Sequence, residues 1–206
     1  MDAIVPPRER SARMRERQLQ DMPLAVAEHE VLGARITTLM KYHDASAQDL
    51  IRALKYDGSA HAAKLAAELL AEYLREEIAS LALFSQKKIL IVPLPLHKSR
   101  SRERGFNQIE IVLKQLPQAF RDGTLAALAP HALIRARATK QQTKLSRAER
   151  IKNVVGAFEV PDASAVRNTH IFLIDDVCTT GATLINAAKP LQKSGAEVSL
   201  LALARA

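Results

Sequence analysis

The segment IFLIDDVCTTGATL, Ile171 to Leu184, decides the fold that this sequence predicts. It begins within a continuous apolar run, His170–Ile174, which is typical of a strand buried on both faces of a parallel sheet. The run ends in Asp175 and Asp176. Because ligands of open α/β sheets bind outside the carboxyl ends of the strands, these two acids mark a candidate binding site.

The chain around this segment predicts an α/β architecture. A helix over Ala182–Lys193 and a strand over Val198–Leu203 complete a strand–helix–strand unit, which builds a right-handed parallel crossover. The run KILIV, Lys88–Val92, predicts a second buried strand. Other helices are expected over Ala47–Lys55, Ala60–Leu81, Phe106–Leu116 and Arg147–Asn153, a short helix over Leu24–Met40, and short strands over Ala132–Ile134 and Phe158–Val160. We therefore expect a mainly parallel sheet flanked by helices.

Composition limits the class of protein. The chain has 206 residues, of which 48% are hydrophobic and 25% charged, so it can bury one sizeable core. It contains no apolar run near the roughly 18 residues that a membrane helix needs, and its first residues lack the apolar stretch of a secretory signal. Its single cysteine excludes an internal disulfide and a cysteine-based zinc site. We expect a cytoplasmic protein without membrane insertion and without zinc.

The turn after the two acids suits a phosphate group. Thr179, Thr180 and Thr183 supply hydroxyl donors, and Gly181 allows close approach of the backbone to a ligand. The first N–H groups of the following helix have no partner within the helix, and the helix dipole is positive at that end. A phosphate would therefore find hydrogen-bond donors and a favourable field in this turn.

The two acids suit the other half of a phosphorylated sugar. Carboxylates accept hydrogen bonds from sugar hydroxyls and also bind hard cations such as Mg²⁺. Neither GxxxxGK[ST] nor GxGxxG occurs in the chain, so the turn is neither a P-loop nor a dinucleotide fingerprint. The alternative is structural: Asp175 and Asp176 would only end the strand, and Thr179 would cap the helix.

This segment resembles the phosphoribosyl pyrophosphate (PRPP) signature of type I phosphoribosyltransferases, in which an apolar strand is followed by two acids and a TTGAT-like turn. The resemblance implies the type I phosphoribosyltransferase fold, with a helical N-terminal hood region. It also implies that Asp175 and Asp176 hold the ribose hydroxyls. The 5′-phosphate would lie in a turn that we call the phosphate loop, made of Cys178, Thr179, Thr180, Gly181, Ala182 and Thr183.

Three further blocks narrow the resemblance to the ComF/GntX family. They are DLIRALKYDG (Asp49–Gly58), IVPLPLHKSRSRERGFNQ (Ile91–Gln108) and RARATKQQTKLSRAERIKNVVGAF (Arg135–Phe158). With the PRPP signature they follow the family's order. The sequence departs from many family members, which begin with a four-cysteine zinc module. We accordingly divide the chain into residues 1–43, a tail and helical region of unknown role, and a phosphoribosyltransferase-like domain, residues 44–206.

Positive charge is concentrated in two stretches. The chain has a net charge of +8, whereas residues 97–104 and 135–152 together hold eleven basic and two acidic side chains. Such clustering favours a polyanionic ligand, although two solvated loops would show the same composition. By resemblance the first stretch is the pyrophosphate loop and the second a flexible lid. The expected contacts are His97, Lys98, Arg102 and Arg104 in the first, and Arg137, Gln142 and Arg150 in the second.

The cysteine and two of the histidines do not indicate a catalytic nucleophile or a metal site. Cys178 would lie at a helix start, which favours a thiolate, but no histidine is placed to act as its base, so we interpret it as a small loop residue. His97 and His131 do not have the spacing of metal ligands.

The predicted function is that of a PRPP-binding, Mg²⁺-dependent phosphoribosyltransferase that transfers ribose 5-phosphate to an unidentified acceptor and releases pyrophosphate. An alternative is a non-catalytic protein that binds PRPP or single-stranded DNA and supports DNA uptake, because the resemblance links ComF proteins to natural competence. Regulatory PRPP sensing is a third interpretation. The sequence leaves the oligomeric state open, a homodimer included.

Overall fold

The computed structural model describes residues 13–96, 105–136 and 155–206. Two short 3₁₀ helices (η1, η3) and one π-helix (η2) accompany the α-helices and strands. The elements are η1 (Leu19–Asp21), β1 (Ala27–Val31), β2 (Ala34–Lys41), α2 (Ala45–Arg52), η2 (Ala53–Asp57), α3 (Ala60–Ala82), β3 (Lys88–Pro93), α5 (Gln108–Lys114), η3 (Gln118–Phe120), β4 (Ala127–Leu128), β5 (Ile134–Arg135), β6 (Phe158–Glu159), α7 (Ala163–Val166), β7 (Thr169–Cys178), α8 (Ala182–Lys193) and β8 (Glu197–Arg205).

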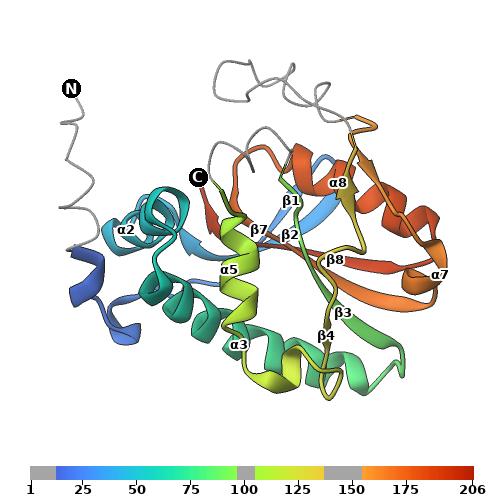
Figure 1. Cartoon of the computed structure of the whole chain (residues 1–206), viewed down its shortest axis with the longest axis horizontal. Helices are drawn as coiled ribbons and strands as arrows, with labels where there is room; N and C mark the ends of the chain where they lie inside the picture. The colour runs from blue at the N-terminus through green and yellow to red at the C-terminus, as the bar shows by residue number, and fades with distance from the viewer. Residues whose placement is uncertain (1–12, 97–104, 137–154) are drawn as a thin grey trace.

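One large sheet organises the described part of the chain. Its strand order is β1-β2-β8-β7-β3-β4 (Figure 1). β1 is antiparallel to β2, and every other neighbouring pair is parallel. The carboxyl ends of β2, β8, β7 and β3 therefore meet at one edge of the sheet. The predicted mainly parallel sheet flanked by helices is confirmed.

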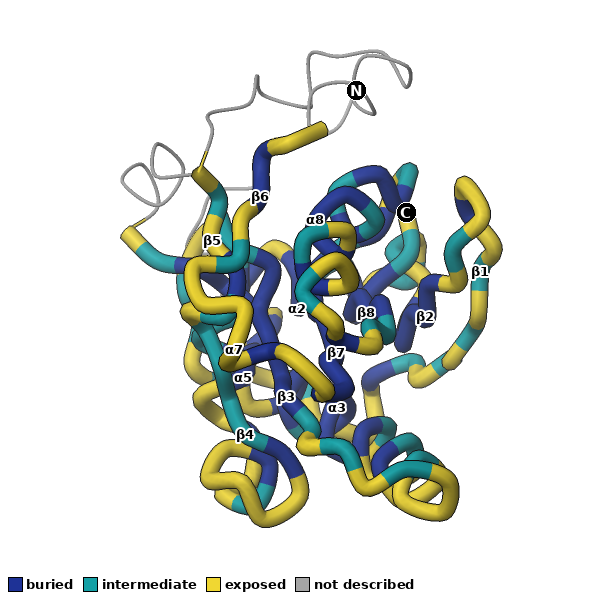
Figure 2. Tube along the Cα trace, turned by 90° about the vertical axis from the view of Figure 1, so that its right-hand side faces the viewer, coloured by how far each residue is buried: buried dark blue, intermediate teal, exposed yellow. Residues whose placement is uncertain are grey.

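Helices cover both faces of this sheet, and the central strands are largely buried (Figure 2). α8 packs Leu184 and Leu191 in one apolar cluster with Ile171 and Leu173 of β7. α3 and α5 belong to a second cluster, which contains Phe172 from the opposite face of the same strand. The chain thus leaves β3 toward one face and β7 toward the other. The carboxyl ends of these two neighbouring strands form a topological switch point, where ligands bind in open α/β sheets.

The helix predicted over Leu24–Met40 is wrong. This stretch forms the hairpin β1–β2, in which Leu32 and Gly33 have φ values of 52° and 75°. Two successive residues with positive φ make the tight turn that joins antiparallel strands, so Gly33 is a turn residue. β2 then pairs with β8 and buries Ile36 completely. Burial against the sheet outweighs local helix preference.

The other predicted elements among the described residues lie near their expected positions, whereas η1, η3, β4 and α7 were not predicted. α8 has the predicted bounds, whereas β7 continues past Ile174 to Cys178. The helix predicted over Arg147–Asn153 lies outside the described residues. None of the described helices is long and apolar enough to cross a membrane.

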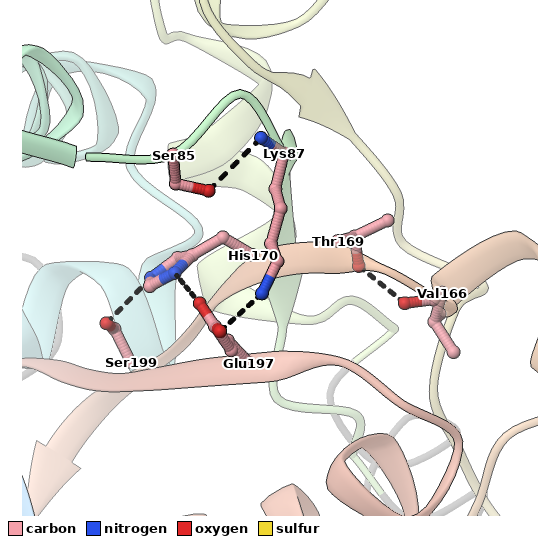
Figure 3. A network of polar contacts seen from close by, with 7 residues as sticks. All are labelled: Ser85, Lys87, Val166, Thr169, His170, Glu197 and Ser199. Carbon is pink, nitrogen blue, oxygen red and sulfur yellow. Dashed lines mark hydrogen bonds and ion pairs between the residues drawn. The ribbon is translucent and has the colours of Figure 1, made fainter. Parts of the chain in front are cut away.

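A polar network joins three strands at the amino ends of β7 and β8, opposite the switch point (Figure 3). Glu197 forms an ion pair with Lys87, which directly precedes β3, and its Oε2 lies 3.5 Å from Nδ1 of His170. The other ring nitrogen of His170 lies 2.9 Å from Oγ of Ser199. Burial lowers the pKa of His170, although the neighbouring Glu197 acts in the opposite direction.

Candidate phosphate and sugar site

Asp175 and Asp176 lie within β7, at the carboxyl edge of the sheet. We predicted them directly after the strand, but pairing with β8 continues from Asp175 opposite Ala202 to Cys178 opposite Arg205. The strand extends because β8 offers a hydrogen-bonding partner along its full length. Successive strand residues point to opposite faces, so the two carboxylates have different surroundings.

Asp176 is buried and held by two side chains from other elements. Its Oδ2 accepts a hydrogen bond from Nε2 of Gln108, at 2.6 Å, and lies 3.2 Å from Nζ of Lys55. Asp176 is only 5% exposed. A buried carboxylate needs a cation and hydrogen bonds to offset its lost hydration, and these two partners supply both.

Asp175 is partly buried, and its charge is less well compensated. Its Oδ1 accepts a hydrogen bond of 2.8 Å from the backbone N–H of Asp176. Burial, followed by the neighbouring charge of Asp176, raises the pKa of Asp175 from 3.8 to about 7. The Asp176 N–H and the more distant Lys55 lower this pKa by less. At neutral pH Asp175 is therefore partly protonated, and a ligand hydroxyl that donates to it favours the ionised form.

The position of Gln108 depends on Asn107, which caps α5. Oδ1 of Asn107 accepts the N–H of Ile109 at 3.1 Å, and its Nδ2 donates to the carbonyl of Leu94 at 3.2 Å. The N–H of Leu94 donates in turn to the carbonyl of Ile174 in β7. These bonds join the start of α5 to the ends of β3 and β7, and so place Gln108 beside Asp176.

Lys55 approaches from the π-helix η2. That helix ends at Gly58, whose φ of 56° is left-handed. A Cβ atom at Gly58 would lie 3.1 Å from the ring of Phe106, so the glycine also allows the segment before α5 to pack closely against η2. Lys55 and Gln108 thus reach Asp176 from two segments that pack against each other.

The phosphate loop connects β7 to α8 and exposes its hydroxyl residues. Thr179 is exposed and Thr180 partly exposed, whereas Cys178 and Ala182 are almost completely buried. Gly181 has a φ of 68°, and a Cβ atom there would lie 2.6 Å from Cδ1 of Ile36 in β2. The first turn of α8 contains no acidic residue, so its dipole is available to an anion.

Cys178 lacks the properties of an activated nucleophile. Burial raises the pKa of its thiol, although a hydrogen bond of 3.3 Å from Nη1 of Arg205 acts in the opposite direction. The thiol is therefore protonated at neutral pH, which agrees with its interpretation as a small loop residue.

The structure brings together only part of the predicted site. Asp175, Asp176 and the phosphate loop lie at one edge of the sheet. The predicted basic and lid contacts lie outside the described residues; they are His97, Lys98, Arg102, Arg104, Arg137, Gln142 and Arg150.

Sequence reasoning missed three neighbours of the site. Lys55 and Gln108 lie in blocks that we quoted for the resemblance, LKYDG and RGFNQ, which therefore contained the signal. Arg205 gave no signal, because its contact with the phosphate loop arises from the pairing of β7 with β8.

Two observations concern other ligands. Among the described residues, no group of three or more His, Cys, Asp or Glu side chains is arranged to hold a metal ion. A hollow of about 480 Å³ lies at the β1–β2 hairpin, lined by Glu28, Glu30, Gly33 and Arg35. None of these lining residues belongs to the candidate site, and the two carboxylates disfavour an anionic ligand.

The sequence aligns with bacterial proteins named for competence and DNA use. It is 35% identical to competence protein ComFC of Bacillus subtilis over 117 residues, 57% of this chain and 44% of that protein. It is 33% identical to competence protein F of Haemophilus influenzae over 118 residues, 56% of this chain and 50% of that protein. The chain is similar in sequence to the ComF competence proteins. This similarity confirms the resemblance that the sequence blocks indicated.

The chain is also similar to a protein named for DNA utilization. DNA utilization protein YhgH of Escherichia coli K12 is 35% identical over 108 residues, 52% of this chain and 44% of that protein. The alignments thus span about half the length of these curated relatives. No protein-family model matches the chain.

Solved structures that resemble the fold include two phosphoribosyltransferases. Adenine phosphoribosyltransferase from Saccharomyces cerevisiae matches with a TM-score of 0.36 and 12% identity, over 90% of this chain and 88% of that one. A phosphoribosyltransferase from Corynebacterium diphtheriae matches with a TM-score of 0.34 and 17% identity, over 92% and 79%.

Proposed function

We propose that this protein binds PRPP at the carboxyl edge of β7 and transfers its ribose 5-phosphate, with release of pyrophosphate, to an acceptor. One observation carries the proposal. A pair of carboxylates at the switch point of the sheet leads directly into a glycine-containing turn, with exposed threonines, at the start of α8. Such a site suits a phosphorylated sugar, which carries a phosphate and hydroxyl groups a few bonds apart.

The two halves of this site differ in charge preference. The phosphate loop offers hydroxyls, backbone N–H groups and the positive end of a helix dipole to the 5′-phosphate. Asp175 and Asp176 accept hydrogen bonds from the ribose hydroxyls. Lys55 and Gln108 hold Asp176 in place, and Asp175 is the more accessible acceptor.

Mg²⁺ is part of this proposal. Carboxylate oxygens are suitable ligands, but one oxygen of Asp176 already contacts Lys55, and the described residues offer no third acid. We therefore expect the ion to be held mainly by the pyrophosphate oxygens of the substrate, near Asp175. Bound there, Mg²⁺ would neutralise the charge that develops on the leaving pyrophosphate.

The basic stretch that follows β3 fits the same reaction. The chain leaves β3 at the carboxyl edge, beside the end of β7, and the next eleven residues, 94–104, include Lys98, Arg102 and Arg104. Cations beside a departing pyrophosphate stabilise the transition state more than the ground state, because the negative charge of the leaving group increases as the bond breaks.

The proposal is tested by removing both charges of the acid pair. We expect Asp175→Asn/Asp176→Asn to bind PRPP with Mg²⁺ at least ~100-fold more weakly in isothermal titration calorimetry, since several charge-assisted hydrogen bonds are lost. Glu72→Gln/Glu76→Gln is the matched control, because it removes two exposed carboxylates from α3.

Wild-type affinity in the acid-pair variant would contradict the proposal. If the double variant does not fold, Asp175→Asn alone gives the decisive measurement, because Asp175 forms fewer internal contacts than Asp176. Catalysis is tested separately, by following pyrophosphate release from PRPP with nucleobases or oligonucleotides as candidate acceptors.

A second candidate function is non-catalytic binding of single-stranded DNA together with PRPP, in support of DNA uptake. Two observations favour it: the relatives are named for competence and DNA utilization, and the positive charge is concentrated in residues 97–104 and 135–152. DNA and PRPP would then compete for the same cations.

A further inference from the structure

The end of β8 lies against the phosphate loop through the side chain of Arg205. Its Nη1 donates a 2.7 Å hydrogen bond to the carbonyl of Thr179 and a 3.3 Å hydrogen bond to Sγ of Cys178. The backbone holds the arginine in register, because Cys178 pairs with Arg205 and the N–H of Ala206 donates to the carbonyl of Cys178 at 3.0 Å. The contact thus joins two neighbouring strand ends at the point where β7 enters the loop.

The bond to Thr179 fixes the orientation of one peptide group. In a planar trans peptide the carbonyl and the following N–H point in opposite directions, and the described residues contain no cis peptide. With the Thr179 carbonyl directed toward the guanidinium of Arg205, the N–H of Thr180 is directed away from it. A free carbonyl facing into the loop would repel an anion, and Arg205 removes that possibility.

A second constraint acts on the other side of the same turn. Gly181 packs against Val31 and Ile36 of the hairpin, so closely that no side chain fits there. Arg205 holds the beginning of the turn and the hairpin holds its end. The N–H of Thr180 lies between these two fixed points.

We infer that Arg205 is a positioning residue of the phosphate loop, which orients the Thr179–Thr180 peptide so that its N–H is ready to bind a phosphoryl oxygen. This inference rests on the proposed function for the identity of the ligand, but the orientation itself is a property of the ligand-free protein. Arg205 acts through the backbone and need not touch the ligand.

The test uses three variants of the full chain. Arg205→Met removes the donors but keeps much of the side-chain volume, and Arg205→Lys keeps the charge without the planar fork. Arg121→Met is the control. It removes an equal charge from an exposed arginine that precedes β4, the outer strand that β7 and β3 separate from β8.

The first measurement is backbone ¹⁵N relaxation without ligand. We expect the order parameters of Thr179 and Thr180 to fall from about 0.85 to below about 0.6 in Arg205→Met, with little change in α8 and in the Arg121→Met control. Arg205→Lys should give intermediate values. Unchanged order in Arg205→Met overturns the inference. If Arg205→Met does not fold, wild-type order parameters in Arg205→Lys overturn it.

The second measurement is affinity for PRPP and for ribose 5-phosphate by calorimetry. We expect Arg205→Met to bind both ligands roughly 10–100-fold more weakly, because a donor that is already oriented in the free protein loses less entropy when the ligand binds. The Tm of Arg205→Met should stay close to that of the wild type, so that unfolding does not explain the lost affinity. Equal affinity in Arg205→Met and the wild type overturns the inference. Absence of binding in the wild type would contradict the proposed function instead, and the relaxation measurement then decides the role of Arg205.

Discussion

At the scale of single residues, the acid pair shows how adjacent identical side chains acquire different properties. Asp176 has a cation and an amide donor within hydrogen-bonding distance, whereas Asp175 accepts a hydrogen bond from the backbone N–H of Asp176 and has no such cation beside it in the described residues. The pKa of Asp175 rises to about 7, because burial and the negative neighbour disfavour its ionised form. Its protonation is therefore coupled to folding and to ligand binding.

Asp175→Asn should change the pH dependence of stability in a defined direction. Asp175 holds its proton more tightly in the folded state than at its ordinary pKa of 3.8, so this residue reduces the free energy of unfolding as the pH rises from about 4 to 7. Asp175→Asn lacks this loss and should be more stable than the wild type at pH 8 by a few kcal/mol at most, because one pKa unit corresponds to about 1.4 kcal/mol. Urea unfolding at several pH values measures the difference.

Asp162 provides a control of opposite sign. Hydrogen bonds from Ser164 lower the pKa of this exposed carboxyl, so Asp162→Asn should lose stability relative to the wild type only as the pH rises to about 4, with a constant difference from about pH 5 to 8. A constant difference between Asp175→Asn and the wild type across this pH range would show that the raised pKa is absent.

Gly181 is the residue for which a substitution should be most costly to the loop. Gly181→Ala adds a Cβ atom 2.6 Å from Ile36, in a backbone conformation with a φ of 68°. Gly33→Ala has a similar φ but no atom within 4 Å, so it isolates the conformational cost of about 1 kcal/mol. We expect Gly181→Ala to destabilise the protein by ~1–3 kcal/mol more than Gly33→Ala.

A double variant tests whether the steric clash between the new Cβ atom and Ile36 causes the loss of stability. Ile36→Val removes the Cδ1 atom, so Gly181→Ala/Ile36→Val should recover part of the stability lost in Gly181→Ala. Thermal unfolding of the four proteins forms a double-mutant cycle, and strict additivity would rule out a contact between the two positions.

At the scale of elements, the two ends of the parallel strands have separate tasks. The carboxyl ends of β3, β7 and β8 lead to the candidate site, whereas their amino ends are held together by Lys87, His170 and Glu197 (Figure 3). A network at the amino end stabilises strand pairing without occupying the ligand edge. The network and the candidate site therefore lie at opposite ends of the same strands.

His170 should make this network sensitive to acid. Because burial lowers its pKa below 6.5, the unfolded chain takes up a proton at a higher pH than the folded protein, and stability is lost as the pH falls below about 6.5. His170→Gln should show a smaller loss between pH 7.5 and 5.5 in urea unfolding. His43→Gln removes an exposed histidine and should follow the wild type. An identical acid response in His170→Gln would exclude this origin.

At the scale of the whole molecule, the positive charge of the two basic stretches allows a test of the DNA-binding function, through the salt dependence of binding. If residues 97–104 and 135–152 bind DNA, the association constant for a single-stranded oligonucleotide should fall steeply with salt, with a log–log slope of about −0.7 for each phosphate neutralised. Arg102→Ala/Arg104→Ala should reduce the slope by about 1 to 2, and PRPP should displace the oligonucleotide. Fluorescence anisotropy at several salt concentrations measures these effects.

A control variant removes the same charge elsewhere. Arg52→Ala/Arg121→Ala affects two exposed arginines outside both basic stretches and should leave the slope nearly unchanged. Binding that is insensitive to salt, or unaffected by the change at Arg102 and Arg104, would argue against a DNA-binding role for these stretches.

Sequence by itself determined the α/β class, the bounds of α8 and the place of Asp175 and Asp176 at the end of a buried strand. It did so because apolar runs, helical periodicity and the acid–threonine–glycine order are local signals. Only the tertiary structure decided that residues 27–41 are strands, since β8 supplies the partner that makes them so. The pairing and packing of distant segments likewise bring Lys55, Gln108 and Arg205 to the site, and no local pattern encodes those distances.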